Sequence, residues 1–329
     1  GCGFDPEQDL DVAVSLPVTV FAEAARQQGL RVLETGFAHG TVTVMAKGQQ
    51  AEVTQLRSDV DTDGRHAMIR PTKNWQTDAL RRDFTINALY LDAEGSVHDF
   101  VGGIKDLEQG YLRFVGEAAR RLQEDHLRLL RALRFLACYP NLSMPERDQL
   151  ALSQHVNLLP VLSAERIAGE LKQLMTGAAA LPILRQASII GVDRVLFGTI
   201  FSADILVHPA LQKLWGDLSF VQRLACCLPV GERAKAGKLL KLSRAELRFL
   251  LSADQPADRL LVAGLLGPHW ARSAYHLGDV GFLHALQAAC SYQEADWNTT
   301  CPGQVIDQLS EQLRQIVFFQ PPSCPVSGR

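Results

Sequence analysis

The stretch "DLDVAV", residues 9–14, alternates polar and apolar side chains and predicts a half-buried strand near the N-terminus. Successive side chains of a strand point to opposite faces, so Asp9 and Asp11 share one face. The apolar residues of the stretch take the other face. This strand therefore offers one side to a hydrophobic core and two neighbouring carboxylates to the opposite side.

The residues after this strand predict a helix and a small sheet. Pro17 and Gly29 bracket the helical run "VTVFAEAARQQ", since proline favours the first helical turn and glycine the position past the end. Three β-like runs follow, "RVLET", "TVTVMA" and "AEVTQLR", separated by glycine-containing turns. Residues 58–78 are polar without a clean period, so we expect a long mobile loop there. The runs "TINALYLD" and "SVHDF" predict a hairpin that closes the sheet.

From Leu107 onward the pattern is helical, and prolines punctuate it. Strands followed by a long helical part indicate an α+β head and an all-helical body. The chain has 329 residues, which is enough for two or more domains.

The composition excludes several classes of protein. A net charge of −3 and a pI near 6.3 exclude a bulk polybasic nucleic-acid binder, so any nucleic-acid contact needs local patches. The seven cysteines show no Cys-x-x-Cys spacing of a zinc or redox site, which favours a reducing, cytoplasmic compartment. No apolar run approaches the roughly 20 residues of a membrane span, and no signal peptide pattern is present, so we expect no membrane partner.

Three acidic residues offer oxygen ligands for a metal. Asp9 and Asp11 are close enough on one strand face to hold a hard cation such as Mg²⁺. Glu52 supplies a third carboxylate if its strand pairs near the first. Such a set suits a two-metal nucleotidyl transfer, in which one ion lowers the pKa of an attacking hydroxyl and another neutralises the leaving pyrophosphate. Taken singly, each residue fits an ordinary solvated strand face better.

Charged and amide side chains crowd the stretch "ALRRDFTINAL", residues 79–89. Arg81 and Arg82 could bind a triphosphate through their permanently charged guanidinium groups. Asp83 and Asn87 could bind a ribose hydroxyl. The alternative is a charged loop capped by Asp83, and local sequence does not separate the two.

Several long motifs occur in the order found in class II tRNA nucleotidyltransferases, the CCA-adding enzymes, and in their bacterial poly(A) polymerase relatives. They are "EVTQLRSDVDTDGRH", "DALRRDFTINALYLD", "HDFVGGIKDL", "RFVGEAARRLQEDHLRLLRALRF" and "LSAERIAGELKQLM". The chain resembles this family densely from its start to about residue 175 and more thinly afterwards.

The resemblance implies a polymerase-β-like nucleotidyltransferase head with a small mixed sheet, followed by an all-helical neck, body and tail. The expected bounds are 1–106 for the head, 107–177 for the neck, 178–256 for the body and 257–329 for the tail. The family adds C, C and A to the 3′ end of tRNA from CTP and ATP, without a template and with Mg²⁺. Poly(A) synthesis, or addition of only the terminal A, is the alternative within the family.

The resemblance also assigns roles by position. Asp9 and Asp11 match the metal-binding pair, and Glu52 matches the third acidic residue. The matches to nucleotide-binding positions are Arg82, Asp83 and Asn87.

The stretch "EDHLRLLRALRF", residues 124–135, matches the helix that reads the incoming base in this family. Cytosine and adenine present an amino donor beside a ring-nitrogen acceptor, whereas uracil and guanine present a carbonyl beside a ring N–H. A carboxylate with an arginine complements the first two, and Asp125 and Arg128 share a helix face at i and i+3. Arg131 suits the phosphates or support of that pair, and Arg134 suits a scaffold or tail-end contact. Without the resemblance, a surface salt bridge explains the pair.

One segment departs from the family pattern. The family carries Gly-Gly-x-Val-Arg-Asp-x-Leu-Leu-Gly before the metal-binding pair, where glycines let the backbone approach the triphosphate and the arginine binds it. This chain has only "GCGFDPEQ" there. We expect either a fragment or a protein that has lost this segment, and the second case favours a non-catalytic RNA-binding remnant.

The stretch "GERAKAGKLLKLSRAELRF", residues 231–249, is the best candidate for RNA contact outside the head. Ser243 and Glu246 predict a capping box that opens a helix. Basic side chains there could follow tRNA phosphates and make binding salt-dependent, although a solvated helix surface explains them as well. The sequence carries no signal for the oligomeric state. The basic residues are Arg233, Lys235, Lys238, Lys241, Arg244 and Arg248.

Overall fold

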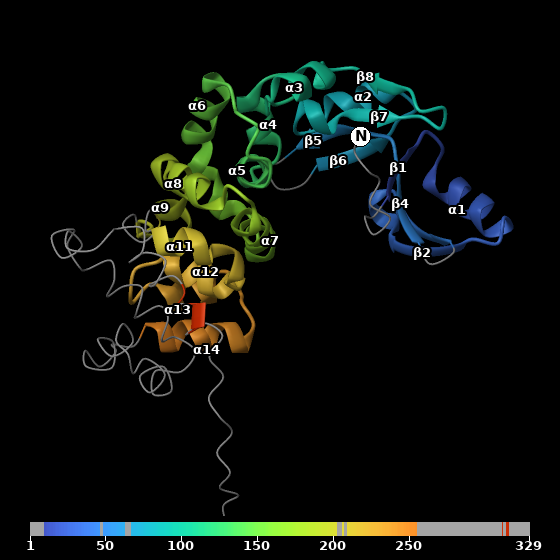
Figure 1. Ribbon diagram of the computed structural model, residues 1–329. Helices are drawn as coiled ribbons and strands as arrows, with labels where there is room; N and C mark the ends of the chain where they lie inside the picture. The colour runs from blue at the N-terminus through green and yellow to red at the C-terminus, as the bar shows by residue number, and fades with distance from the viewer. Residues whose placement is uncertain are drawn as a thin grey trace, which may run out of the picture. The chain divides into compact units, whose positions relative to one another are not determined.

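The protein forms two compact units (Figure 1). The first contains residues 1–128 and 143–155, and the second contains residues 129–142 and 156–329. The first unit combines strands and helices, whereas the described part of the second is helical, which confirms the predicted α+β head followed by a helical region. The expected bounds of the four segments stay predictions. The computed structural model describes residues 10–46, 49–62, 67–202, 206, 209–254, 311 and 314–315.

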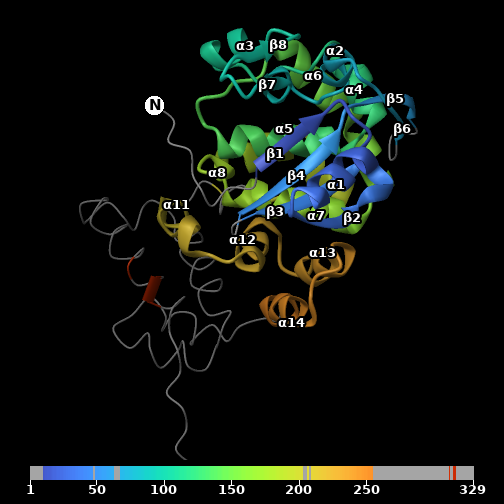
Figure 2. The same cartoon turned by 90° about the vertical axis from the view of Figure 1, so that its right-hand side faces the viewer.

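The first unit begins with β1 (Leu10–Val14), α1 (Val18–Gln27), β2 (Arg31–Gly36), a 3-10 turn η1 (Phe37–His39), β3 (Thr41–Ala46) and β4 (Gln49–Gln55). The four strands form one mixed sheet in the order β1-β4-β3-β2, in which only β1 and β4 are parallel. Helix α1 packs on one face of this sheet (Figure 2). Val18 and Ala22 of α1 form a buried core there with Val42, Val44 and Val53. The predicted strands and helix are confirmed.

The predicted loop at residues 58–78 is wrong. β5 (Arg57–Thr62) and β6 (Ala67–Pro71) form an antiparallel pair, and α2 (Trp75–Leu80) follows. The pairing register shifts within this two-stranded sheet. A shift of this kind interrupts the two-residue alternation of side chains, which explains why the sequence shows no clean strand period.

The predicted hairpin is confirmed, but it does not close the main sheet. β7 (Leu89–Leu91) and β8 (Val97–Asp99) form a separate two-stranded sheet after a 3-10 turn, η2 (Thr85–Asn87). Alternation predicts that a strand exists but not which strand it pairs with. α3 (Gly103–Gln109) follows, and the Asp99 carboxylate accepts four backbone N–H groups at its start.

Residues 124–135 do not form one helix, contrary to the prediction. α4 (Ala118–Glu124) ends before Asp125, whose φ of −149° and ψ of 108° are extended, and α5 (Leu127–Cys138) begins after it. The Asp125 carboxylate accepts the N–H of Leu127 at 3.1 Å. Short acidic side chains are favoured at helix starts because they bind N–H groups that the helix leaves open. The last helix of the first unit is α6 (Glu146–His155).

The regular elements of the second unit, among its described residues, are all helices. The predicted capping box is confirmed, since Ser243 and Glu246 bind each other's backbone N–H groups at the start of the last described long helix. No described helix has both the length and the apolar character that a bilayer crossing requires. Besides the end of α5, the elements are η3 (Val156–Val161), α7 (Ala164–Thr176), α8 (Ala180–Ile190), α9 (Val192–Phe197), α11 (Pro209–Leu214), η4 (Trp215–Asp217), α12 (Phe220–Cys227), α13 (Arg233–Leu239) and α14 (Arg244–Ala253).

Candidate active site

Asp11 and Glu52 lie side by side in the main sheet. The parallel register places Asp11 opposite Glu52 and Val12 opposite Val53. Val53 is buried in the core beneath α1, so the preceding position on each strand points to the other face of the sheet. Both acids are exposed there. The predicted condition for a shared acidic site, that the strand of Glu52 pairs near the first strand, is confirmed.

The metal-binding role of this face stays a prediction. Asp9 lies outside the described residues, and the described residues contain no group of three His, Cys, Asp or Glu side chains placed for a metal. Asp11 and Glu52 are hard oxygen donors, which are the ligands that Mg²⁺ prefers. Their placement on neighbouring strands fits part of a magnesium site.

A buried carboxylate that the sequence analysis missed holds the arginine pair. Arg81 donates from Nε and Nη2 to Asp78 Oδ1 at 3.0 and 2.7 Å, and Arg82 donates from the same atoms to Oδ2 at 3.1 and 2.9 Å. The Tyr90 hydroxyl donates to Oδ2 at 2.7 Å, and the Arg57 backbone N–H donates to Oδ1 at 3.0 Å. The available signal was the spacing of the acid three and four residues before the two arginines, which is typical of helical ion pairs.

The charges around Asp78 favour its ionised form. Burial by itself raises the pKa of Asp78, but the guanidinium groups of Arg81 and Arg82 outweigh burial and lower this pKa to about 2. Burial, together with the hydrogen bond to Asp78, raises the pKa of Tyr90 to about 12. Near neutral pH the cluster therefore contains one carboxylate, two guanidinium groups and a protonated phenol.

Asp83 and Asn87 bind each other. Asp83 Oδ1 accepts the backbone N–H of Phe84 at 2.9 Å and Nδ2 of Asn87 at 3.2 Å. The Asp83 residue is 7% exposed. The turn capped by Asp83, which was one of the two readings of this stretch, is present, and contact with a ribose stays a prediction.

Arg128 is held by an acid and two backbone carbonyls. Its Nη1 donates to Glu124 Oε2 at 2.8 Å and to the Arg121 carbonyl at 3.0 Å, and its Nη2 donates to the Arg81 carbonyl at 2.8 Å. The side chain is 10% exposed, and none of the described residues accepts a hydrogen bond from its Nε. Asp125 caps α5, so the prediction that Asp125 and Arg128 lie on the face of one helix is wrong, and joint contact of the two with a base stays a prediction. Glu124 is the supporting acid that the sequence analysis missed, although its i,i+4 spacing was visible.

Arg131 and Arg134 belong to the second unit, where both approach Glu170 of α7. Arg134 Nε lies 2.8 Å from Glu170 Oε2, and Arg131 Nη1 lies 3.9 Å from Oε1. Arg134 also donates to the Gln173 side chain. Arg134 thus makes the scaffold type of contact that was predicted, and binding of phosphates by Arg131 stays a prediction.

An open cavity of about 390 Å³ lies beside the arginine cluster in the first unit. Arg81, Arg121 and Glu124 contribute to its wall, which comes from β5, α2 and α4. Arg121 donates to the Leu80 carbonyl at 2.9 Å and to Glu124 at 2.8 Å. The volume is in the range of small-molecule sites, and the wall carries both signs of charge.

The basic stretch at residues 231–249 divides into buried and exposed side chains. Arg233 is fully buried and donates to the carbonyls of Ala225, Leu228 and Ala253, so its predicted RNA contact is wrong. A buried guanidinium bound to carbonyls stabilises helix ends instead. Two exposed lysines form surface ion pairs, Lys235 with Glu232 and Lys241 with Glu165. The exposed basic residues are Lys235, Lys238, Lys241, Arg244 and Arg248.

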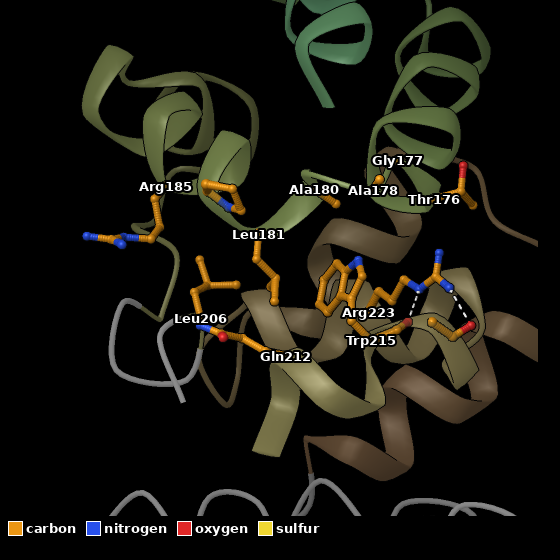
Figure 3. A pocket seen from close by; sticks show the side chains of 12 residues that line it. Thr176, Gly177, Ala178, Ala180, Leu181, Arg185, Leu206, Gln212, Trp215 and Arg223 are labelled. Carbon is orange, nitrogen blue, oxygen red and sulfur yellow. Dashed lines mark hydrogen bonds between the residues drawn. The ribbon is translucent and has the colours of Figure 1, made fainter. Parts of the chain in front are cut away.

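A second cavity, of about 530 Å³, lies wholly within the second unit (Figure 3). Arg223 lines it, is 7% exposed, and donates to the carbonyls of Trp215, Met175 and Gly216 at 2.9, 2.9 and 3.0 Å. In Figure 3 the Arg185 guanidinium points away from Arg223. None of the predicted site residues lines this cavity.

The sequence is similar to characterised proteins over about half of its length. Residues 4–113 match the family described as the poly A polymerase head domain. The mitochondrial CCA tRNA nucleotidyltransferase 1 of Homo sapiens is 40% identical over 174 residues, which cover 52% of this chain and 40% of that protein. The CCA-adding enzyme of Geobacillus stearothermophilus is 35% identical over 190 residues, which cover 56% and 46%. The match spans less than half of the length of either relative.

Solved structures with the same fold cover nearly the whole chain. The Bacillus stearothermophilus CCA-adding enzyme in complex with CTP has a TM-score of 0.68 and 24% identity, and the match covers 94% of this chain and 74% of that one. The Thermotoga maritima CCA-adding enzyme complexed with tRNA CCA has a TM-score of 0.68 and 21% identity, with coverage of 94% and 73%. At these identities the likeness shows the fold.

Proposed function

We propose that the chain belongs to the class II tRNA nucleotidyltransferase family of CCA-adding enzymes and poly(A) polymerases, to which it is similar, and that it adds C, C and A to the 3′ end of tRNA. CTP and ATP are the nucleotide substrates. The observation that carries the proposal is the strand register that sets Asp11 beside Glu52 on an exposed sheet face. Acidic residues on neighbouring strands are what metal-dependent nucleotidyl transfer requires.

In this reaction the tRNA 3′-hydroxyl oxygen attacks the α-phosphorus of the nucleotide. A new phosphorus–oxygen bond forms, the bond to the bridging oxygen of the β-phosphate breaks, and pyrophosphate leaves. Asp9 and Asp11 would hold Mg²⁺, and Glu52 would be the third acidic residue. Bound Mg²⁺ would lower the pKa of the attacking hydroxyl and neutralise the leaving pyrophosphate.

The base would be chosen by Asp125 and Arg128. The carboxylate accepts from the amino group of cytosine or adenine, and the guanidinium donates to the neighbouring ring nitrogen. The bonds from Arg128 to Glu124 and to two carbonyls support this role, because they fix the guanidinium while its Nε keeps no acceptor among the described residues. Donors that are already oriented discriminate between bases better than mobile ones.

One assay separates the candidate activities. The purified chain is incubated with Mg²⁺ and a tRNA that lacks its terminal CCA, in the presence of CTP alone, ATP alone, or both. A CCA-adding enzyme extends the RNA by two nucleotides with CTP and by three with both. Long tails from ATP alone would assign poly(A) synthesis, which the head-domain match also allows. Binding of tRNA without any extension would identify a non-catalytic binder.

Asp11→Ala is expected to reduce incorporation by about a thousandfold or more, because loss of a metal ligand removes several kcal/mol of transition-state stabilisation. The melting temperature should change little, since Asp11 is exposed. Glu34→Ala is the matched control, an exposed acid on β2 of the same sheet that pairs with Arg26, and it should keep full activity. Normal incorporation by Asp11→Ala would defeat the proposed mechanism.

A further inference from the structure

Asp78 is a buried carboxylate with a complete set of donors. It lies in α2 with its side chain 1% exposed, and it accepts hydrogen bonds from two guanidinium groups, a phenol and a backbone N–H. An ionised group in such a place persists only when charged partners compensate for its lost hydration. Arg81 and Arg82 supply that compensation, so their positions and that of Asp78 depend on one another.

The two arginines are not equally available to a ligand. Arg81 also donates from Nε to the Arg57 carbonyl at 2.9 Å, and its side chain is 14% exposed. Arg82 binds Asp78 through Nε and Nη2 only, and its side chain is 35% exposed. The bonds to Asp78 leave Nη1 on the other edge of the guanidinium, which also lies beside Tyr90, with Cζ 5.9 Å from the ring centroid. Because a guanidinium is planar and rigid, binding one edge to Asp78 fixes the direction of the remaining Nη1 donors.

The same cluster lies next to the anchored Arg128. The Arg81 backbone carbonyl accepts from Arg128 Nη2 at 2.8 Å, while the Arg81 side chain is bound to Asp78. A shift of Arg81 would therefore disturb both the acid that holds Arg82 and an acceptor of Arg128.

We propose that Asp78 is a positioning residue for nucleoside triphosphate binding, which acts by presenting the Nη1 edge of Arg82 to the phosphates or ribose of CTP and ATP. This inference rests on the function proposed above. Asp78 itself does not touch the nucleotide. Its effect is to hold one guanidinium in a single direction, so that the nucleotide does not have to order a mobile side chain when it binds.

The test compares nucleotide binding in the wild-type chain and in Asp78→Asn, by equilibrium dialysis with labelled CTP and with labelled ATP. The amide keeps the size of the side chain but loses the charge that orients both arginines. Loss of a charge-assisted contact is expected to weaken both nucleotides by about 10- to 100-fold. The KM for each nucleotide should rise by the same factor, while kcat with saturating nucleotide falls much less.

Two further comparisons separate positioning from general stabilisation. Asp148→Asn is the matched control, because Asp148 is also a buried acid of the first unit, 1% exposed, that accepts the Phe114 N–H. It should lower the melting temperature without changing nucleotide affinity. If Asp78 acts through Arg82, Asp78→Asn should weaken binding further by less than twofold in a chain that already carries Arg82→Gln.

Should Asp78→Asn fail to fold, Asp78→Glu decides the question. It keeps the charge but moves the carboxylate by one methylene group, so weaker nucleotide binding at wild-type stability is expected. Unchanged nucleotide affinity in a folded Asp78 variant would overturn the inference. The inference would also fail if Asp78→Asn weakened nucleotide binding equally in the wild-type chain and in the chain that lacks Arg82. Wild-type chain that binds nucleotide without extending tRNA would defeat the proposed function instead and leave the binding comparison valid.

Discussion

Carboxylates with little solvent exposure contact arginine side chains in both units of this protein. Asp78 binds Arg81 and Arg82 in the first unit, and Glu170 binds Arg134 in the second. Asp78 binds one edge of each of its two guanidinium groups and so sets the direction of the other edge. Removal of Asp78 would leave two partly buried cations without their partner, which costs more than the contact itself contributes.

The low pKa of Asp78 predicts acid-dependent stability. The pKa falls from 3.8 to about 2 on folding, so the folded protein binds this proton less tightly than the unfolded chain does. The stabilisation, about 2 kcal/mol, is present above the unfolded value and is lost as pH falls through the folded value. We expect the free energy of unfolding of the wild type to lose this amount between about pH 4 and pH 2.

Urea titrations at several pH values measure this effect. Asp78→Asn should have a lower free energy of unfolding than the wild type near neutral pH, but it should not lose the Asp78 contribution as the pH falls. The difference in free energy of unfolding between the two proteins should therefore shrink in acid. Asp148→Asn should retain the loss, because it leaves the Asp78 cluster intact. Parallel profiles for the wild type and Asp78→Asn would contradict the assignment of this low pKa.

The residue-scale features of the site were partly readable from the sequence. The arginine pair, Asp83 and Asn87 stand out because they crowd one short stretch. The importance of Asp78 and Glu124 could not be read from the sequence, although both acids precede their arginines by helical spacing. The same spacing is common on solvated helix faces, and only burial shows that these acids organise the site.

At the scale of single elements, the break between α4 and α5 decides what Asp125 does. Asp125 and the arginines that follow it recur every three residues, and this spacing continues across the break between α4 and α5. The sequence pattern therefore resembles that of one uninterrupted helix. In the structure Asp125 is extended and caps α5, which begins at Leu127. Periodicity reports which residues share a face within a helix, but it does not report where one helix ends and the next begins.

Two glycines allow a test of helix packing with opposite expected signs. A Cβ on Gly103, at the start of α3, would lie 2.2 Å from the Thr85 carbonyl oxygen, which is backbone and cannot rotate away. Gly103→Ala should therefore lower the free energy of unfolding by about 1–3 kcal/mol. A Cβ on Gly169, inside α7, meets nothing within 4 Å, so Gly169→Ala should raise it by about 0.5–1 kcal/mol.

Urea unfolding followed by circular dichroism measures both glycine variants under the same conditions. Each serves as the control for the other, because both add a single methyl group to a helix. Equal changes of the same sign would show that helix propensity, rather than the close approach at Gly103, governs these positions.

At the scale of the whole molecule, a net charge of −3 means that the proposed RNA binding depends on local basic groups. Lys235 and Lys238 are exposed on α13. If they contact tRNA phosphates, neutralising both as Lys235→Gln with Lys238→Gln should weaken tRNA binding and reduce the slope of log K against log salt by about 1–2. Filter binding at several salt concentrations measures this slope.

The control for the lysines removes the same charge elsewhere in the second unit. Arg185 and Arg194 are exposed on α8 and α9, so Arg185→Gln with Arg194→Gln changes the net charge equally. This pair should leave the salt slope near that of the wild type. Equal effects of the two pairs would mean that net charge, and not a phosphate-binding surface on α13, governs the affinity.

The sequence by itself determined the order of the elements, the change from a strand-rich part to helices, and the motif order that resembles that of the CCA-adding enzymes. These features depend on local periodicity and spacing, which the chain carries whatever its partners are. Tertiary structure alone decided that Asp11 meets Glu52, that the hairpin forms its own sheet, and that Asp78 is buried among arginines. Strand pairing and burial depend on contacts between residues far apart in the sequence, and no local pattern specifies them.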